Sequence, residues 1–198
     1  MRSIRFCMPV LLFLLACSLP LRAIEVQISA RAMENTLQQQ LFQGGSGRVY
    51  LRGNADHGCA LYAESPKISF ANNRIVVDIT IQGVLGKVLF GKCVGVPIHT
   101  SPQVSLVPVA HGEVVGFEDA RIDRVTENGE LNALAMPFLK NKLPHSMEIN
   151  VSDQLRKLLS DQTKTSGYRF TLKNLNLVTL AVQGDHLFLD VEAKIQVE

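Results

Sequence analysis

The sequence predicts an α+β fold in which amphipathic helices lie on one face of a strongly coiled antiparallel sheet. Apolar residues alternate strictly with other residues from Leu187 to Val197, and again from Arg74 to Gln82 with the exception of Val76. A period of two is typical of a strand with one buried face. Other segments have apolar residues at helical spacing, each with a single apolar stripe. Each such helix must therefore cover a sheet from one side.

Residues 1–23 are predicted to be an export signal. Arg2 and Arg5 precede an apolar run that is too short to span a membrane. Cleavage after Ala23 is the favoured interpretation and leaves one domain, residues 24–198. The alternative is a lipobox ending at Cys17, whose lipidation would tether the protein to a membrane. The protein is expected to be periplasmic or envelope-associated, and the second case would make it an outer-membrane lipoprotein.

The domain is expected to open with an amphipathic helix over residues 30–42, capped by Ser29. A strand-rich region over residues 48–125 follows and contains a turn at positions 72–73 and a long strand over 74–84. Glycines at positions 83, 86, 91 and 95 predict bulges or tight bends, which would let the sheet coil.

Two helical pieces are expected after this region. The first covers residues 131–139, with Pro137 either kinking it or marking its start, and the second covers 151–159 with Ser152 as its candidate cap. A turn at 183–185 then joins the last two strands, which form a hairpin.

The charge of the chain argues against a nucleic-acid partner. Cleavage after Ala23 removes Arg2, Arg5 and Arg22, so the 20 Lys and Arg residues fall to 17 against 18 Asp and Glu. The remaining sequence has no basic stripe interleaved with aromatic residues. Such a stripe is the usual signature of nucleic-acid binding.

Cys59 and Cys93 survive either way of processing and are predicted to form a disulfide in an oxidising compartment. Closing a loop of this size would stabilise the fold by roughly 3 to 4 kcal/mol. A metal site would need His57 and His99 in addition to the two thiols. Their spacing matches no compact ligand motif, so we expect no metal and no other cofactor.

No catalytic constellation is evident, and we expect no enzymatic activity. Ser46 lies in a glycine-rich segment, but this segment follows a helix instead of a strand, and Arg48 takes the place of the closing glycine of a nucleophile elbow. Glu118 and Asp119 are neighbours on a strand and point to opposite faces, so they cannot act as a pair. The histidines form no closely spaced pair.

The order of these elements resembles bacterial envelope proteins of the tubular lipid-binding superfamily, which includes the bactericidal/permeability-increasing protein. The resemblance rests on the opening helix, the strand that begins at Asn72, the helical block before Tyr168 and the closing strand. It implies a strongly twisted antiparallel sheet wrapped around a long amphipathic helix. It also implies an apolar groove between the two, with a lipid as the usual ligand.

We therefore expect an exported protein that binds a lipid or another hydrophobic molecule in a groove between helix and sheet. Burial of an acyl chain yields about 0.8 kcal/mol per methylene. The alternative is a periplasmic interaction or scaffolding module with a filled core and no ligand, whose protein partner the sequence does not identify. The expected ligand lining consists of the apolar stripes Met33, Leu37, Leu41, Ile75, Val77, Ile79, Ile81, Leu134 and Phe138.

Overall fold

A computed structural model of the chain describes residues 24–43, 46–56, 58–124 and 129–198. The predicted export signal, with Cys17, and the candidate ligand His57 lie outside the described residues. Of these described residues, 27% are helical and 57% lie in strands. The predicted combination of helices with a curled antiparallel sheet is confirmed.

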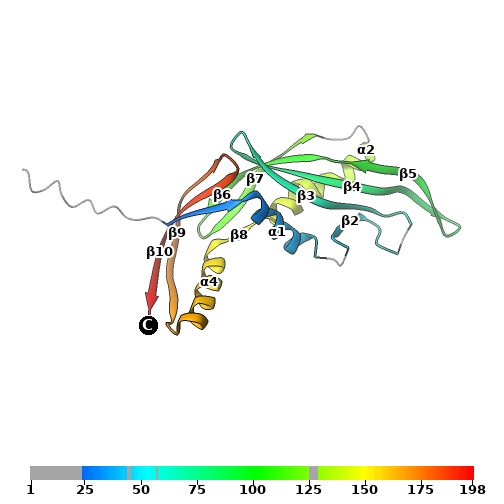
Figure 1. The fold of residues 1–198 in the computed structure, drawn as a ribbon. Helices are drawn as coiled ribbons and strands as arrows, with labels where there is room; N and C mark the ends of the chain where they lie inside the picture. The colour runs from blue at the N-terminus through cyan, green and yellow to red at the C-terminus, as the bar shows by residue number, and fades with distance from the viewer. Residues whose placement is uncertain (1–23, 44–45, 57, 125–128) are drawn as a thin grey trace, which may run out of the picture.

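The larger sheet has the strand order β2-β3-β4-β6-β7-β8, and β5 pairs with β4 off this path. Strand β4 is the central strand of this sheet. It pairs with β6 near its start and with β5 over its second half (Figure 1). All of these pairings are antiparallel. The strands are β2 (Arg48–Arg52), β3 (Leu61–Ala71), β4 (Arg74–Leu89), β5 (Lys92–Thr100), β6 (Gln103–His111), β7 (Val114–Arg124) and β8 (Ile149–Asn150).

The smaller sheet joins the two ends of the domain. It has the order β1-β10-β9, in which β1 (Ile24–Ser29) and β9 (Phe170–Gln183) both pair with β10 (His186–Val197). Helix α4 (Val151–Ser166) packs against β9. These elements extend away from the larger sheet as an arm, by which we mean α4, β9 and β10 (Figure 1).

Helix α1 (Ala30–Leu41) begins as the sequence predicts. The Oγ atom of Ser29 accepts a hydrogen bond from the backbone N–H of Ala32 at 3.3 Å. Met33 and Leu37 on the apolar stripe are buried, and α1 packs on β3. Glu34 fastens the two elements together, because its carboxylate accepts a hydrogen bond from the N–H of Ile68 at 2.8 Å.

The second helical region changes its winding at proline. Helix α2 (Gly129–Pro137) continues directly into a π-helical turn, η1 (Phe138–Lys142), and then α3 (Leu143–His145). Pro137 lacks the N–H that an α-helix needs, so a widened turn after it is the expected accommodation. The longest continuous helical stretch has 17 residues, and α1 has 12. The long central helix that the resemblance implied is therefore not seen in the described residues.

The cap of α4 differs from the prediction. Asn150 is the N-cap and accepts the backbone N–H of Asp153 at 3.0 Å, whereas Ser152 lies inside the helix and is fully buried. The Ser152 hydroxyl donates to the Asn150 side chain and accepts from Arg156 at 2.9 Å. Asn and Ser are both good N-cap residues. Asn150 takes this position because β8 ends there and the helix begins at the next residue.

The glycines of β4 and β5 make no bulge in that pairing, whose register is unbroken from Ile81 to Leu89. Gly86 and Gly95 face each other, and a Cβ atom on Gly86 would lie 2.2 Å from the carbonyl oxygen of Val94. They allow a close approach of two backbones. Register shifts occur elsewhere, including between Glu64 and Lys67 in β3.

Candidate ligand groove

The predicted ligand lining lies in the core of the protein. Seven of its nine residues are buried in one hydrophobic cluster, and the other two, Leu41 and Leu134, pack against that cluster. Met33, Leu37, Ile75, Val77, Ile79 and Ile81 each expose 2% or less of their surface. Side chains this deeply buried leave no room beside them for an acyl chain. Their role as a core is observed, and their role as a ligand lining stays a prediction.

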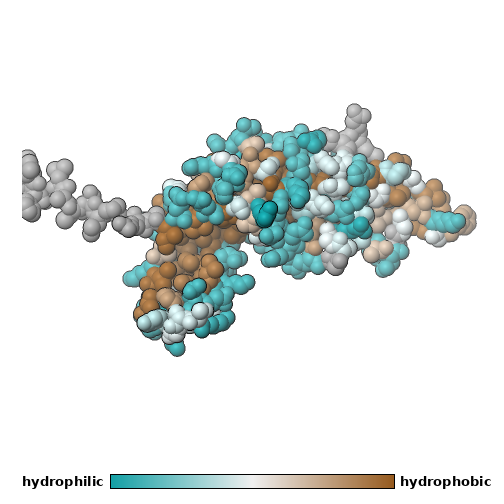
Figure 2. All heavy atoms as spheres, in the orientation of Figure 1, coloured by the Kyte–Doolittle hydropathy of each residue, from teal (hydrophilic) through white to brown (hydrophobic). Residues whose placement is uncertain are grey.

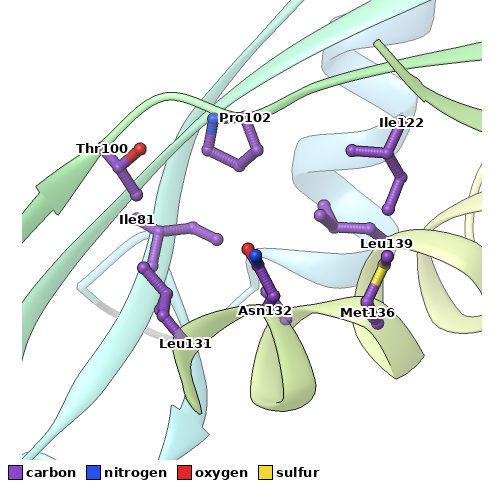
Figure 3. Close-up of a pocket in the computed structure, with 9 residues that line it drawn as sticks. Ile81, Thr100, Pro102, Ile122, Leu131, Asn132, Met136 and Leu139 are labelled. Atoms are coloured by element: carbon purple, nitrogen blue, oxygen red, sulfur yellow. The ribbon is translucent and has the colours of Figure 1, made fainter. Parts of the chain in front are cut away.

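The space between β4 and α2 is almost closed. Figure 3 shows Ile81 of β4 and Pro102 facing Leu131, Met136 and Leu139 of the second helical region. The pocket that these residues line has a volume of about 10 Å³. A single water molecule needs roughly this much room, so an acyl chain does not fit there.

The predicted disulfide is present. Cys59 and Cys93 are bonded, and the bond ties β5 to the segment before β3. Both thiols are thereby removed from any metal site. The described residues also contain no group of three or more His, Cys, Asp or Glu side chains that could hold a metal ion. His99 instead lies 3.3 Å from the side-chain oxygen of Gln82.

The acidic residues of β7 have a structural role. Asp119 adopts a left-handed backbone conformation, with φ of 48°, and its carboxylate receives Arg74 at 2.9 Å and Arg121 at 2.8 Å. These hydrogen bonds hold the pKa of Asp119 below its usual value. Arg74 also donates to the Ser105 hydroxyl at 3.0 Å. The cluster therefore fastens β4, β6 and β7 together across a register shift.

An open apolar surface occurs in the arm instead. Leu187, Leu189 and Val191 on the inner face of β10 are buried, but Ile195 and Val197 on the same face are 37% and 54% exposed. These two residues also lie beyond the part of β10 that pairs with β1, which ends at Val191. The inner face of β10 is thus buried in its first half and exposed toward its end.

Helix α4 also carries apolar side chains with incomplete cover. Val151 at its start is buried, Leu155 is half-buried, and Leu158 is 63% exposed. A helix and a sheet that face each other with partly exposed apolar side chains leave a gap between them. Figure 2 shows the result as a continuous hydrophobic surface over the arm.

This gap is a groove between α4 and the strands β1 and β10. It has a volume of about 120 Å³, and nearly all of its exposed lining is apolar. We call it the arm groove. It is lined by Ile24, Val26, Val151, Gln154, Leu155, Leu158 and Val191.

A second hollow of about 320 Å³ adjoins the arm groove and shares Val26, Val151 and Gln154 with it. It continues along α1, where Thr36, Gln39 and Gln40 contribute polar groups. No charged side chain lines either hollow. The two together offer an apolar trough with hydrogen-bonding amides at one end, which suits a chain-like molecule with a polar head. Small-molecule sites commonly have volumes of about 300–1,000 Å³.

The groove residues were missed because they come from three distant parts of the sequence. The usable signal was the apolar alternation that continues to Val197, together with the Leu155 and Leu158 stripe on α4. A strand with a long apolar face needs an equally long cover from another layer. The sequence did not show which strand would be the partner.

Comparisons with known proteins do not assign a family. No family model matches the chain, and no curated protein matches it. A crystal structure of a lipopolysaccharide binding protein is similar over 87% of this chain and 50% of the other, with 11% identity and a TM-score of 0.30. The chain thus corresponds to about half of that protein. A TM-score of this size does not assign the two proteins to one fold family.

Proposed function

We propose that this protein is an exported envelope protein that binds the hydrocarbon chain of a lipid, or a similar elongated apolar molecule, in the arm groove. The observation that carries the proposal is the nearly all-apolar lining between α4 and β10, in a protein whose main core is filled. Apolar side chains such as Leu158 are left exposed there, and a bound chain would remove them from water.

The polar hollow beside α1 supports an amphipathic ligand. Gln39, Gln40 and Gln154 lie at its surface and can hydrogen-bond to the head of a lipid. The apolar tail would then lie between α4 and β10. Burial of each methylene contributes about 0.8 kcal/mol. The sum over all buried methylenes, together with the polar contacts, must exceed the cost of association of about 4–15 kcal/mol.

The proposal is tested with the chain expressed from residue 1 and purified without detergent. Mass spectrometry of an organic extract would identify a carried lipid, and displacement of a fluorescent fatty acid would measure affinity. We expect affinity to rise by about fourfold for each added methylene in a series of saturated fatty acids, until the groove is filled. Clean extracts together with an affinity that does not depend on chain length would overturn the proposal.

A matched pair of variants locates the site. Leu158→Gln removes an apolar wall of the arm groove and is expected to weaken fatty-acid binding by about tenfold. Val178→Gln changes another exposed apolar residue, in β9, that does not line the groove, and is expected to leave binding unchanged. Equal effects of the two substitutions would place the binding elsewhere.

The filled core also favours the second candidate function, an interaction or scaffolding module without a small ligand. Met33, Leu37 and Ile75 pack as in an ordinary globular interior. In that case the groove would accept no fatty acid, and crosslinking in the envelope would capture one protein in stoichiometric amount. The same crosslink would be lost in Leu158→Gln only if the partner used the arm.

A further inference from the structure

The end of the β4–β5 hairpin projects from the protein without cover. We define the hairpin tip as residues 87–94. Val88, Leu89, Phe90 and Val94 are all exposed large apolar side chains. In Figure 1 the tip lies at the opposite end of the molecule from α4. It is therefore separate from the arm groove.

Phe90 is unusual in two ways. It is completely exposed, and it occupies the apex of the turn with a positive φ of 51°, followed by Gly91 at 75°. Two successive positive φ values are typical of a type I′ hairpin turn, whose first central position favours Asn, Asp or Gly. An aromatic residue there is strained and also leaves a large apolar ring in water. Nothing within the described chain compensates for either cost.

The charge around the apolar tip is positive. Lys87 and Lys92 are exposed on either side of Phe90, and the sequence from position 84 to 100 contains no Asp or Glu. The domain as a whole is nearly neutral once residues 1–23 are removed, with 17 basic and 18 acidic residues. The tip is thus a local concentration of positive charge beside exposed apolar groups.

The tip is also held in place. The disulfide joins Cys93, which pairs with Val88 in the hairpin, to Cys59 outside it. The Gly86 and Gly95 pair brings the two strands into close contact at its base. Because these contacts already order the tip, little conformational entropy is lost when it binds to another surface.

We propose that the hairpin tip inserts Leu89 and Phe90 into the surface of an anionic lipid bilayer, while Lys87 and Lys92 contact the headgroups. Segments that bind at the membrane interface typically bury Phe and Leu and carry Lys or Arg beside them. Lysines near an anionic membrane are attracted to it over distances of about one Debye length. The bilayer accounts for both the apolar apex and the cationic flanks, whereas an apolar protein partner would account only for the first.

The chain contains no tryptophan, so Phe90→Trp introduces a single fluorescent reporter at the apex. We would use a Cys17→Ala background, in which no lipid can be attached at Cys17. On addition of phosphatidylglycerol-containing phosphatidylcholine vesicles, we expect a blue shift and quenching by brominated lipid. Val178→Trp, on β9, is the control and should show neither change. A reporter at position 90 that stays water-exposed with these vesicles would overturn the proposal.

The partner of this experiment is Phe90→Asn in the same background. Asn suits the left-handed turn, so the melting temperature should be unchanged or higher, while vesicle partitioning falls by about tenfold or more. Lys87→Gln should weaken partitioning by about fivefold, and only at low salt. Unchanged partitioning of Phe90→Asn would refute insertion. A concentration-dependent dimer that Phe90→Asn abolishes, without vesicle binding, would assign the tip to a second copy of this chain and also refute it.

Discussion

Removal of the Cys59–Cys93 disulfide should lower the free energy of unfolding by about 3–4 kcal/mol, from the chain-entropy model for a closed loop of this size. The two cysteines are 34 positions apart. The closed loop contains all of β3 and β4, which include several core residues such as Ile75 and Ile79. The crosslink therefore restricts, in the unfolded chain, the segment that the native core must order.

The measurement is urea unfolding, followed by circular dichroism, of the oxidised protein and of a variant carrying Cys59→Ala and Cys93→Ser. Ala is chosen at position 59 because that side chain is buried, and an unpaired hydroxyl would add a separate cost. The denaturant dependence should be steeper for the variant, because an uncrosslinked chain exposes more surface on unfolding.

Reduced wild-type protein should match the variant, and a reductant should not change the variant itself. A stability difference below about 1 kcal/mol, with equal denaturant dependence, would refute the reasoning. The disulfide would then not stabilise the protein by restricting the unfolded chain.

Three further predictions concern the core, the pH dependence and the hairpin. Leu189→Ala should lower the free energy of unfolding by about 2–5 kcal/mol in urea titrations, because Leu189 is fully buried. A smaller loss would mean that the surrounding side chains fill the cavity. Because its pKa is lowered in the folded protein, Asp119 stabilises the fold above its usual pKa of 3.8 and loses this effect as pH falls through the folded value. The unfolding free energies of wild type and Asp119→Asn should thus differ near neutral pH and converge on acidification, and parallel pH curves would contradict the assignment to Arg74. Gly86→Ala places a Cβ 2.2 Å from the Val94 carbonyl oxygen, so amide hydrogen exchange should accelerate in the β4–β5 hairpin, and unchanged protection would show that the strands can separate at little cost.

Much of the fold was predictable because it depends on local chemistry. The alternation from Leu187 to Val197 predicted a strand, and β10 spans His186–Val197. Ser29 was predicted as a cap and is one. The turn at Asn72 and Asn73 forms with positive φ at both positions, a conformation that Asn tolerates well.

The candidate site was not predictable in the same way. Periodicity showed that Met33, Ile75 and Phe138 would face inward, and they do. It could not show whether the facing stripes would leave a cavity, because packing depends on side chains that meet only in the folded protein. The positive φ of Phe90 was also not predictable, because the segment Leu-Phe-Gly-Lys is compatible with both a strand and a turn.

The sequence by itself determined which face of each element is apolar, where the first helix and the turn at Asn72 and Asn73 begin, and which cysteines pair. The tertiary structure decided what covers each apolar face. It placed the stripes of α1 and β4 in one filled core and left Leu158 and Val197 exposed in the arm. The physical reason is that burial depends on the lengths and directions of elements far apart in the chain. The six residues of β1 pair with only the first six residues of β10, and Leu158 on α4 stays exposed beside the strands.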